Sequence, residues 1–334
     1  MTPARPPAPG SNADDRAAAG SMPRVRVERE APRSDQAMLI VNPIATTVSK
    51  GATAEIAATL RKRYAVDVRV TDARGHATQL AQEAVDRGVG LVAVYAGDGT
   101  TNEAIQALAG SETALAHLPG GSSSVLARIL GMGGSGPAAA RRVVAPQQRA
   151  RRIDLGDVNG RPFSFSAGIG LDAAVVKLVD GDLQRKQRLR WTAFWLEAVR
   201  TARHEYFGAA PSMTVASGGE EVRAVSAIVQ NAEAYTYAGP RPLTVGRDVS
   251  LESHTLQATA VTDGLRWVDV PSLTYRTLSA ADADRHPRLH TLPASAELTV
   301  TCDRPMPIQL DGDYWTDMTE ARFTVRPRAL TVIS

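Results

Sequence analysis

The chain has 334 residues, enough for two domains with separate cores, and its 43% hydrophobic and 22% charged residues are ordinary for a globular protein. Because 38 basic residues stand against 35 acidic ones, the net charge is only +3, and the composition does not indicate a nucleic-acid-binding protein. Cys302 is the only cysteine, which excludes an internal disulfide and a cysteine-based metal cluster.

The N-terminal segment, residues 1–36, is rich in Pro, Ala and Arg and has no hydrophobic periodicity. We expect a disordered tail, with a basic arm for a membrane or a protein partner as the alternative. The segment lacks the apolar stretch of a secretion signal, and no apolar run in the chain approaches the roughly 20 residues of a membrane-spanning helix. We therefore expect a cytoplasmic protein.

Short apolar runs alternate with helical patterns between residue 37 and residue 148. This alternation favours a doubly wound α/β domain with a parallel sheet. Open sheets of this kind bind ligands at the carboxyl ends of their strands, so polar turns there are candidate binding sites. Strands are predicted at residues 37–41, 66–70, 91–95 and 114–118, and helices at residues 54–63, at residues 77–87 and after the third strand.

The third strand ends in the turn Gly97-Asp98-Gly99, directly before a helical pattern. Backbone amides and the dipole at a helix N-terminus favour phosphate, and Asp98 in the turn could bind a metal or accept a proton. A purely structural alternative is a capping box of Thr100 and Glu103, which needs no ligand. Neither a Walker-type motif nor G-x-G-x-x-G occurs at this junction, so the two commonest nucleotide-binding signatures are absent.

Two motifs in this half resemble those of a known family. Gly-Asp-Gly-Thr-x-Asn-Glu at residues 97–103, followed by Pro-Gly-Gly-Ser-x-Ser at 119–124 and by Ala127-Arg128, is similar to the catalytic domain of the diacylglycerol kinase and sphingosine kinase superfamily. The likeness is strongest to bacterial soluble lipid kinases of an actinobacterial type, and it covers most of residues 38 to 333. It implies transfer of the γ-phosphate of ATP, with Mg²⁺, to a lipid hydroxyl, that of diacylglycerol or a related lipid. NAD kinases share the Gly-Asp-Gly turn, but the motifs of this chain at residues 119–124 and 311–313 are less similar to theirs than to those of the lipid kinases.

The resemblance also implies which residues contact the nucleotide. In the turn after the first strand, Ala45 and Thr46 stand where the family has Ser and Gly. In the loop after the fourth strand, Ser122 and Ser124 stand where it usually has Thr and Asn. The nucleotide-binding residues implied in this way are Asn42, Pro43, Ile44, Ala45, Thr46, Thr71, Gly97, Gly99, Thr100, Thr101, Asn102, Glu103, Gly121 and Ser122.

From residue 149 onward, short runs with period-two alternation favour a mainly antiparallel β-sandwich. An Asn159-Gly160 dipeptide predicts the turn of a hairpin. We expect residues 37–148 to be a nucleotide-binding kinase catalytic domain and residues 149–334 to be a β-sandwich domain that completes the lipid and catalytic site. Strands are predicted at residues 152–158, 163–167, 212–216, 222–230, 256–261, 297–302, 307–310, 321–325 and 330–333.

Residues 184–207 interrupt these strands with a helical pattern that carries six Arg or Lys residues and an aromatic face around Trp191 and Trp195. A basic helix with an aromatic face suits an anionic membrane surface, so peripheral binding at the inner membrane face is one interpretation. The other is that the aromatic residues pack on the sheet while the basic residues are solvated. We expect a lipid substrate at a membrane surface and no nucleic-acid partner, and a homodimer stays open.

The last motif, Asp311-Gly312-Asp313, is by its local pattern an acidic turn at the end of a strand, which favours a hairpin. It resembles the family's Asp-Gly-Glu/Asp motif, whose final carboxylate is proposed as the general base. The resemblance therefore implies Asp313 as the base, with Asp98 as the competing candidate and otherwise as the organiser of metal and phosphates. No protein ligand of the metal is assigned, because Glu252-Ser253-His254 replaces the family's metal-binding loop. A catalytically weak homologue that senses lipid or nucleotide is the alternative from another class.

Overall fold

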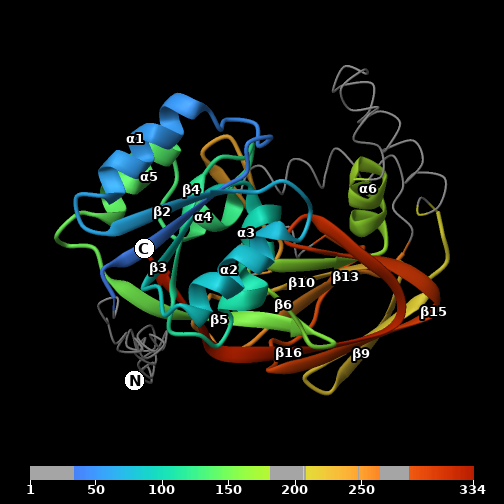
Figure 1. Cartoon of the computed structure of the whole chain (residues 1–334). Coiled ribbons are helices and arrows are strands. Elements are labelled where there is room, and N and C mark those ends of the chain that lie inside the picture. The colour runs from blue at the N-terminus through green and yellow to red at the C-terminus, as the bar shows by residue number, and fades with distance from the viewer. Residues whose placement is uncertain (1–33, 181–205, 207, 247, 264–285) are drawn as a thin grey trace, which may run out of the picture.

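The computed structural model describes residues 34–180, 206, 208–246, 248–263 and 286–334 (Figure 1). The predicted N-terminal tail, up to residue 33, and the predicted basic helix, apart from Tyr206, lie outside the described residues. Within the described residues, no helix is both long enough and apolar enough to cross a membrane.

The first part of the described chain is a parallel sheet covered by helices (Figure 1). Its elements are β1 (Gln36–Val41), α1 (Lys50–Leu60), β2 (Ala65–Val70), α2 (His76–Asp86), β3 (Leu91–Ala96), α3 (Asp98–Leu108), β4 (Ala114–Pro119), α4 (Val125–Ile129) and α5 (Gly136–Val143). The strands lie in the order β2-β1-β3-β4, and all neighbours pair in parallel. β3 is buried along its whole length, as expected for a strand covered on both faces. α1 packs beside α5, and α2 packs beside α3.

The second part is mainly antiparallel. Its elements are β5 (Ala150–Val158), β6 (Arg161–Phe163), β7 (Ser166–Ile169), α6 (Leu171–Asp180), β8 (Met213–Ser217), β9 (Glu220–Ala224), β10 (Ser226–Gln230), β11 (Ala234–Ala238), β12 (Arg241–Thr244), β13 (Gln257–Val261), β14 (Leu289–Thr291), β15 (Glu297–Leu310) and β16 (Asp313–Ile333). In its core, the rings of Phe163 and Phe323 pack edge to face with their centroids 6.2 Å apart. α6 packs on β7, β15 and β16.

The last strand, β16, joins the two parts. It pairs antiparallel with β15 and β5, and near its end Val332 pairs in parallel with Leu115 of β4. The described strands other than β11 and β12 thus form one 14-stranded sheet. Leu330 and Ile333 are buried in the same core as β3. This continuous sheet fixes the turn between β15 and β16 relative to the carboxyl ends of the parallel strands.

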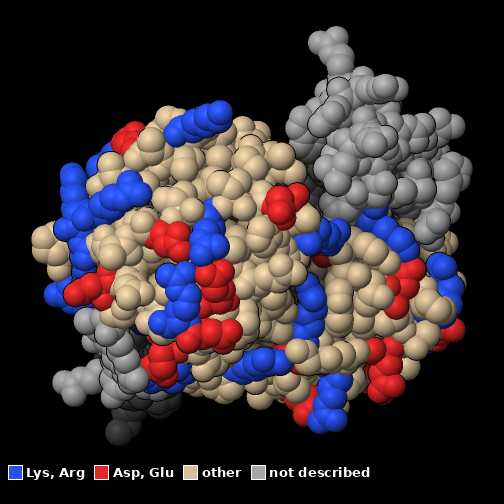
Figure 2. Space-filling view, viewed as in Figure 1, with Lys and Arg blue, Asp and Glu red and all other residues tan. Residues whose placement is uncertain are grey.

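Basic and acidic side chains are interspersed over much of the face shown in Figure 2. Some of the described charged residues form ion pairs, since Arg69 lies 2.8 Å from Glu83 and Arg141 lies 2.8 Å from Glu55. The mixture agrees with the small net charge of the chain.

The predicted alternation of strands and helices in the first part is confirmed, and so is the parallel sheet. α1 begins at Lys50 instead of residue 54, because the Ser49 hydroxyl accepts a hydrogen bond from the Ala52 amide and caps the helix. The predicted hairpin is also confirmed. β5 pairs with β6, and Asn159 and Gly160 between them have φ angles of 50° and 90°.

Several strand boundaries predicted for the second part are wrong. The predicted strand 222–230 is divided at Val225 into β9 and β10. Conversely, the predicted strands 297–302 and 307–310 are the single strand β15, and 321–325 and 330–333 lie in the single strand β16. Both long strands continue through register irregularities, between residues 301 and 306 and between 326 and 330, where the apolar alternation is interrupted. The sequence patterns also missed α6, β11, β12 and β14.

Candidate functional site

The carboxyl ends of the parallel strands open into a cleft of about 820 Å³. The turn between β15 and β16 forms another wall of the same cleft. Thr101 and Asn102, which the resemblance implies as nucleotide contacts, are instead buried in α3 and do not line it. The predicted site residues that line the cleft are Asn42, Pro43, Ile44, Ala45, Thr46, Thr71, Gly97, Asp98, Gly99, Thr100, Glu103, Gly121, Ser122 and Asp313.

The cleft has a further wall that the sequence patterns did not indicate. It consists of Asp72, Ala73 and Arg74, which directly follow the end of β2 and Thr71. Their position at the carboxyl end of a predicted parallel strand is the signal that could have found them.

α3 begins at Asp98, and its N-cap residue, Gly97, provides no side-chain cap. The alternative capping box is therefore wrong. The Thr100 hydroxyl instead accepts a hydrogen bond from Asn42 Nδ2 at 2.9 Å, and Glu103 Oε2 accepts one from the Ala77 amide at 3.3 Å. Because the first amides of a helix have no partner within it, this uncapped end at the cleft favours an anionic ligand.

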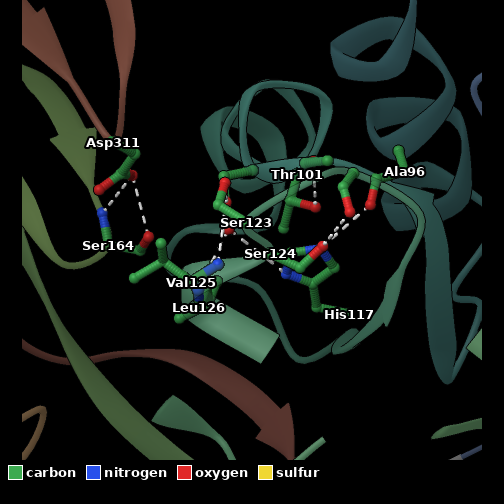
Figure 3. Close-up of polar contacts among 12 residues, drawn as sticks. Ala96, Thr101, His117, Ser123, Ser124, Val125, Leu126, Ser164 and Asp311 are labelled. Atoms are coloured by element: carbon green, nitrogen blue, oxygen red, sulfur yellow. Dashed lines mark hydrogen bonds and ion pairs between the residues drawn. The ribbon is translucent and has the colours of Figure 1, made fainter. Parts of the chain in front are cut away.

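The carboxylate of Asp98 is occupied by contacts with the start of α4. Its Oδ2 accepts hydrogen bonds from the Val125 amide at 2.9 Å and the Ser123 hydroxyl at 3.2 Å, and its Oδ1 accepts one from the Leu126 amide at 3.1 Å. In Figure 3 these three donors converge beside α3. The side chain is 8% exposed, and His117 lies beneath it with Nδ1 4.0 Å from Oδ1 and a pKa that burial lowers. These contacts favour a role of Asp98 in holding the loop at 119–124 against α3.

The two glycine-rich turns touch backbone to backbone. A Cβ atom at Gly121 would lie 2.7 Å from Gly97 Cα, so only glycine fits at position 121. Ser124, at the end of the loop, has a φ of 44°, a left-handed conformation in which Asn is enriched. The backbone therefore gives a physical reason for the Asn that the family usually has at this position.

Asp311 anchors the turn between β15 and β16. Its buried carboxylate accepts a hydrogen bond from the amide of Ser164 at 2.7 Å (Figure 3). It also accepts from the amides of Phe165 and Ser166 at 2.9 and 3.2 Å, and from Asn102 Nδ2 at 2.7 Å. Burial raises the pKa of Asp311, and these donors oppose the rise. The contacts also correct the predicted strand 163–167, which is interrupted between β6 and β7 because its amides turn toward this carboxylate.

Asp313, the candidate base, lies against the first turn of α3. A Cβ atom at Gly99 would lie 2.1 Å from Asp313 Oδ2, so the carboxylate occupies the space that a side chain would need there. Asp313 lines the main cleft and also an adjoining hollow of about 580 Å³, which Arg74 and Arg161 line as well. The tertiary structure thus brings the candidate base beside the helix N-terminus.

The loop that stands in place of the family's metal-binding loop is held by protein groups. Asp154 accepts hydrogen bonds from the amides of His254 and Arg328, both at 2.8 Å, and lies 3.0 Å from His254 Nδ1. Among the residues that the structure describes, no group of three or more His, Cys, Asp or Glu could hold a metal ion. The carboxylate of Glu103 at the cleft fits a magnesium ion that arrives with a nucleotide and keeps several waters.

Comparison with known proteins agrees with this geometry. Residues 36–158 match the family described as the diacylglycerol kinase catalytic domain. A protein of Pseudomonas aeruginosa named "Probable lipid kinase YegS-like" is 38% identical over 120 residues, 35% of this chain and 39% of that protein. The diacylglycerol kinase of Bacillus subtilis is 36% identical over 109 residues, 32% of this chain and 36% of that protein. The match thus spans less than half of these curated relatives.

The fold is shared over a longer stretch. A crystal structure of a diacylglycerol kinase from Bacillus anthracis superimposes with a TM-score of 0.68, covering 91% of this chain and 98% of that chain at 21% sequence identity. At this identity the likeness bears on the fold alone. Residues 36–158 are thus similar to the catalytic domain of diacylglycerol kinases, and the fold similarity extends over most of the chain.

Proposed function

We propose that the protein is an ATP-dependent lipid kinase that transfers the γ-phosphate to a lipid hydroxyl, that of diacylglycerol or a related lipid. One observation carries the proposal: the carboxylate of Asp313 lies against Gly99, in the first turn of α3. A base for an acceptor hydroxyl would thus stand beside the helix N-terminus that receives the phosphates. Phosphoryl transfer depends on such positioning and on charge stabilisation more than on covalent chemistry by the protein.

The phosphates of the donor would bind where α3 begins. Backbone amides of its first turn and of the loop at 119–124 supply the hydrogen-bond donors, and Asp98 holds that loop in place through Val125 and Leu126. The turn at 42–46 and Thr71 line the same cleft and would border the nucleotide. A volume of about 820 Å³ is within the range of small-molecule and cofactor sites.

Asp313 would take the proton of the acceptor hydroxyl while the hydroxyl oxygen attacks the γ-phosphate. Because Asp313 lines both the main cleft and the adjoining hollow, a donor and an acceptor have room to approach it from two sides. Mg²⁺ bound with ATP would neutralise charge on the phosphates, and Glu103, which lines the cleft, would supply a carboxylate for it.

The test is a transfer assay with γ-labelled ATP on mixed micelles that contain diacylglycerol, sphingosine and total bacterial lipid. We expect label in one lipid class, and a loss of about 10²- to 10⁴-fold with Asp313→Asn, the range that a general base contributes. Thermal unfolding of both proteins serves as the control for folding. Unchanged transfer by Asp313→Asn would contradict the base assignment, and no label in any lipid would contradict the kinase.

A catalytically weak homologue that senses lipid or nucleotide is the second candidate function. It is favoured by Asp98, because both oxygens of its carboxylate are already engaged by amides of the protein. Calorimetric binding of Mg-ATP without transfer to any lipid would support this candidate over the enzyme.

We further propose that the lipid is reached at an anionic membrane surface through residues 184–207. The support is the basic and aromatic composition of that segment. Replacement of its basic cluster by Gln should weaken sedimentation with anionic liposomes, and unchanged sedimentation would contradict the proposal. The residues to replace are Arg185, Lys186, Arg188 and Arg190.

A further inference from the structure

Three polar side chains from different elements form a hydrogen-bonded chain that ends at the turn carrying Asp313. The Tyr235 hydroxyl, from β11, donates to Asp172 Oδ1 in α6. Gln309 Nε2, from β15, donates to Asp172 Oδ2 at 2.6 Å. The other end of the same carboxamide, Gln309 Oε1, accepts a hydrogen bond from the Gly312 amide at 2.7 Å.

The pairing of Asp172 with Gln309 is built into the backbone of β7. Gln309 pairs with Gly168 in the sheet, and a Cβ atom at Gly168 would lie 2.0 Å from Asp172 Oδ2 and 2.8 Å from Gln309 Nε2. The side chains of Asp172 and Gln309 therefore occupy the space that a side chain at Gly168 would need. Gln309 is 1% exposed, so few other partners can replace these contacts.

The chemistry of the two groups fixes the direction of the carboxamide. A carboxylate only accepts hydrogen bonds, so Asp172 holds the amide nitrogen of Gln309 toward itself. The amide oxygen must then face Gly312, whose neighbours in sequence are Asp311 and Asp313. Desolvation of the carboxyl group raises the pKa of Asp172, and the hydrogen bonds from Tyr235 and Gln309 oppose this rise.

We infer that Asp172 is a positioning residue that acts through Gln309 to fix the turn at 311–313 and, with it, the carboxylate of Asp313. The inference rests on the proposed role of Asp313 as the base. Asp311 ties this turn to α3 and to the break between β6 and β7, whereas Gln309 holds it from the side of α6. The turn is thus held at two separate points.

The test exchanges the carboxylate and the carboxamide between the two positions. In Asp172→Asn, the carboxamide oxygen can still accept from Gln309 Nε2 while its nitrogen donates to the Tyr235 hydroxyl, so this variant is expected to lose less activity than Gln309→Glu. In Gln309→Glu, two carboxylates face each other. In the double variant, the carboxamide introduced at position 172 can donate to the carboxylate introduced at position 309. The second oxygen of that carboxylate still accepts from the Gly312 amide, and the net charge of the pair is that of the wild type.

We expect kcat to fall by about 100-fold in Gln309→Glu, as for a catalytic group misplaced by about 1 Å, with the KM for ATP nearly unchanged. The double variant should recover at least tenfold of this loss. Tyr235→Phe is the matched control, because it removes a hydrogen bond to Asp172 but leaves Gln309 paired, and its kcat should stay near the wild-type value. A double variant no better than Gln309→Glu would overturn the inference, and so would a change confined to the KM for the lipid.

A second readout does not depend on transfer. Hydrogen exchange of the Gly312 amide should become at least tenfold faster in Gln309→Glu and return toward the wild-type rate in the double variant. If the wild-type protein transferred no phosphate, the proposed function would fail, but this exchange would still decide whether Asp172 fixes the turn. Equal exchange rates in all four proteins would overturn the inference.

Discussion

The close approach of Asp313 to Gly99 predicts that Gly99→Ala lowers activity without lowering stability. The added Cβ atom would lie 2.1 Å from Asp313 Oδ2 and 2.8 Å from its Cγ. A carbon–oxygen contact needs about 3.3 Å, so the carboxylate oxygen must move by at least about 1.2 Å. A misplacement of about 1 Å costs on the order of 100-fold in rate, and we expect kcat to fall by about this factor.

The backbone of α3 should tolerate the same change. Gly99 is the second residue of α3, and its φ is not positive, so alanine fits its conformation. Alanine is favoured over glycine inside a helix by about 1 kcal/mol at most, so the free energy of unfolding should stay constant or rise slightly. Gly51→Ala is the matched control, because Gly51 is the second residue of α1 and a Cβ atom there would meet nothing within 4 Å.

Both variants are compared with the wild type by lipid phosphorylation at saturating ATP and by urea unfolding. The expected result is a low kcat for Gly99→Ala, a normal kcat for Gly51→Ala and no loss of stability in either. Equal kcat values for the two variants would refute the placement of Asp313 against α3. A loss of more than about 1 kcal/mol of stability in Gly99→Ala alone would refute the argument that the helix tolerates the methyl group.

Three further predictions concern buried groups. Asp98→Ala removes the side chain that caps α4, so the free energy of unfolding in urea should fall by about 1–2 kcal/mol and the KM for ATP should rise. An unchanged unfolding curve would contradict the capping role. Asp311→Asn replaces a carboxylate oxygen by an amide nitrogen, which cannot accept a hydrogen bond from the backbone amides that surround it. The free energy of unfolding should therefore fall by about 3 kcal/mol, and a loss below about 1 kcal/mol would contradict the contacts described. Burial raises the pKa of Cys302 to about 11, and the thiolate is the form of the side chain that reacts with iodoacetamide. At pH 8, the native protein should therefore react at least about 100-fold more slowly than the urea-unfolded chain. Equal rates in the two states would show that the thiol is accessible and ionised.

The sequence alone predicted the parallel sheet because its signals are local. Four apolar runs alternate with polar turns and helical patterns, and this alternation predicts parallel strands without any knowledge of which strands pair. The ends of those strands then indicated the wall of the cleft, and the Gly97-Asp98-Gly99 turn does start a helix there. The local capping interpretation of Thr100 and Glu103 failed because both side chains have partners on other elements, Asn42 and the Ala77 amide.

The tertiary structure alone decided what each acidic residue of the site contacts. Asp98 bonds to an amide 27 residues away, and Asp311 bonds to one 147 residues away, so no local spacing could indicate either pair. The path of β16 back to β4 brings Asp313 onto Gly99. A sequence determines local conformation through the period of its side chains, but contacts between distant segments depend on how the sheets and helices pack. The residue types at this site, and Asp313 as the candidate base through the family resemblance, could therefore be inferred from the sequence. The roles of Asp311 as anchor and Asp98 as loop holder follow only from the packing of the two parts.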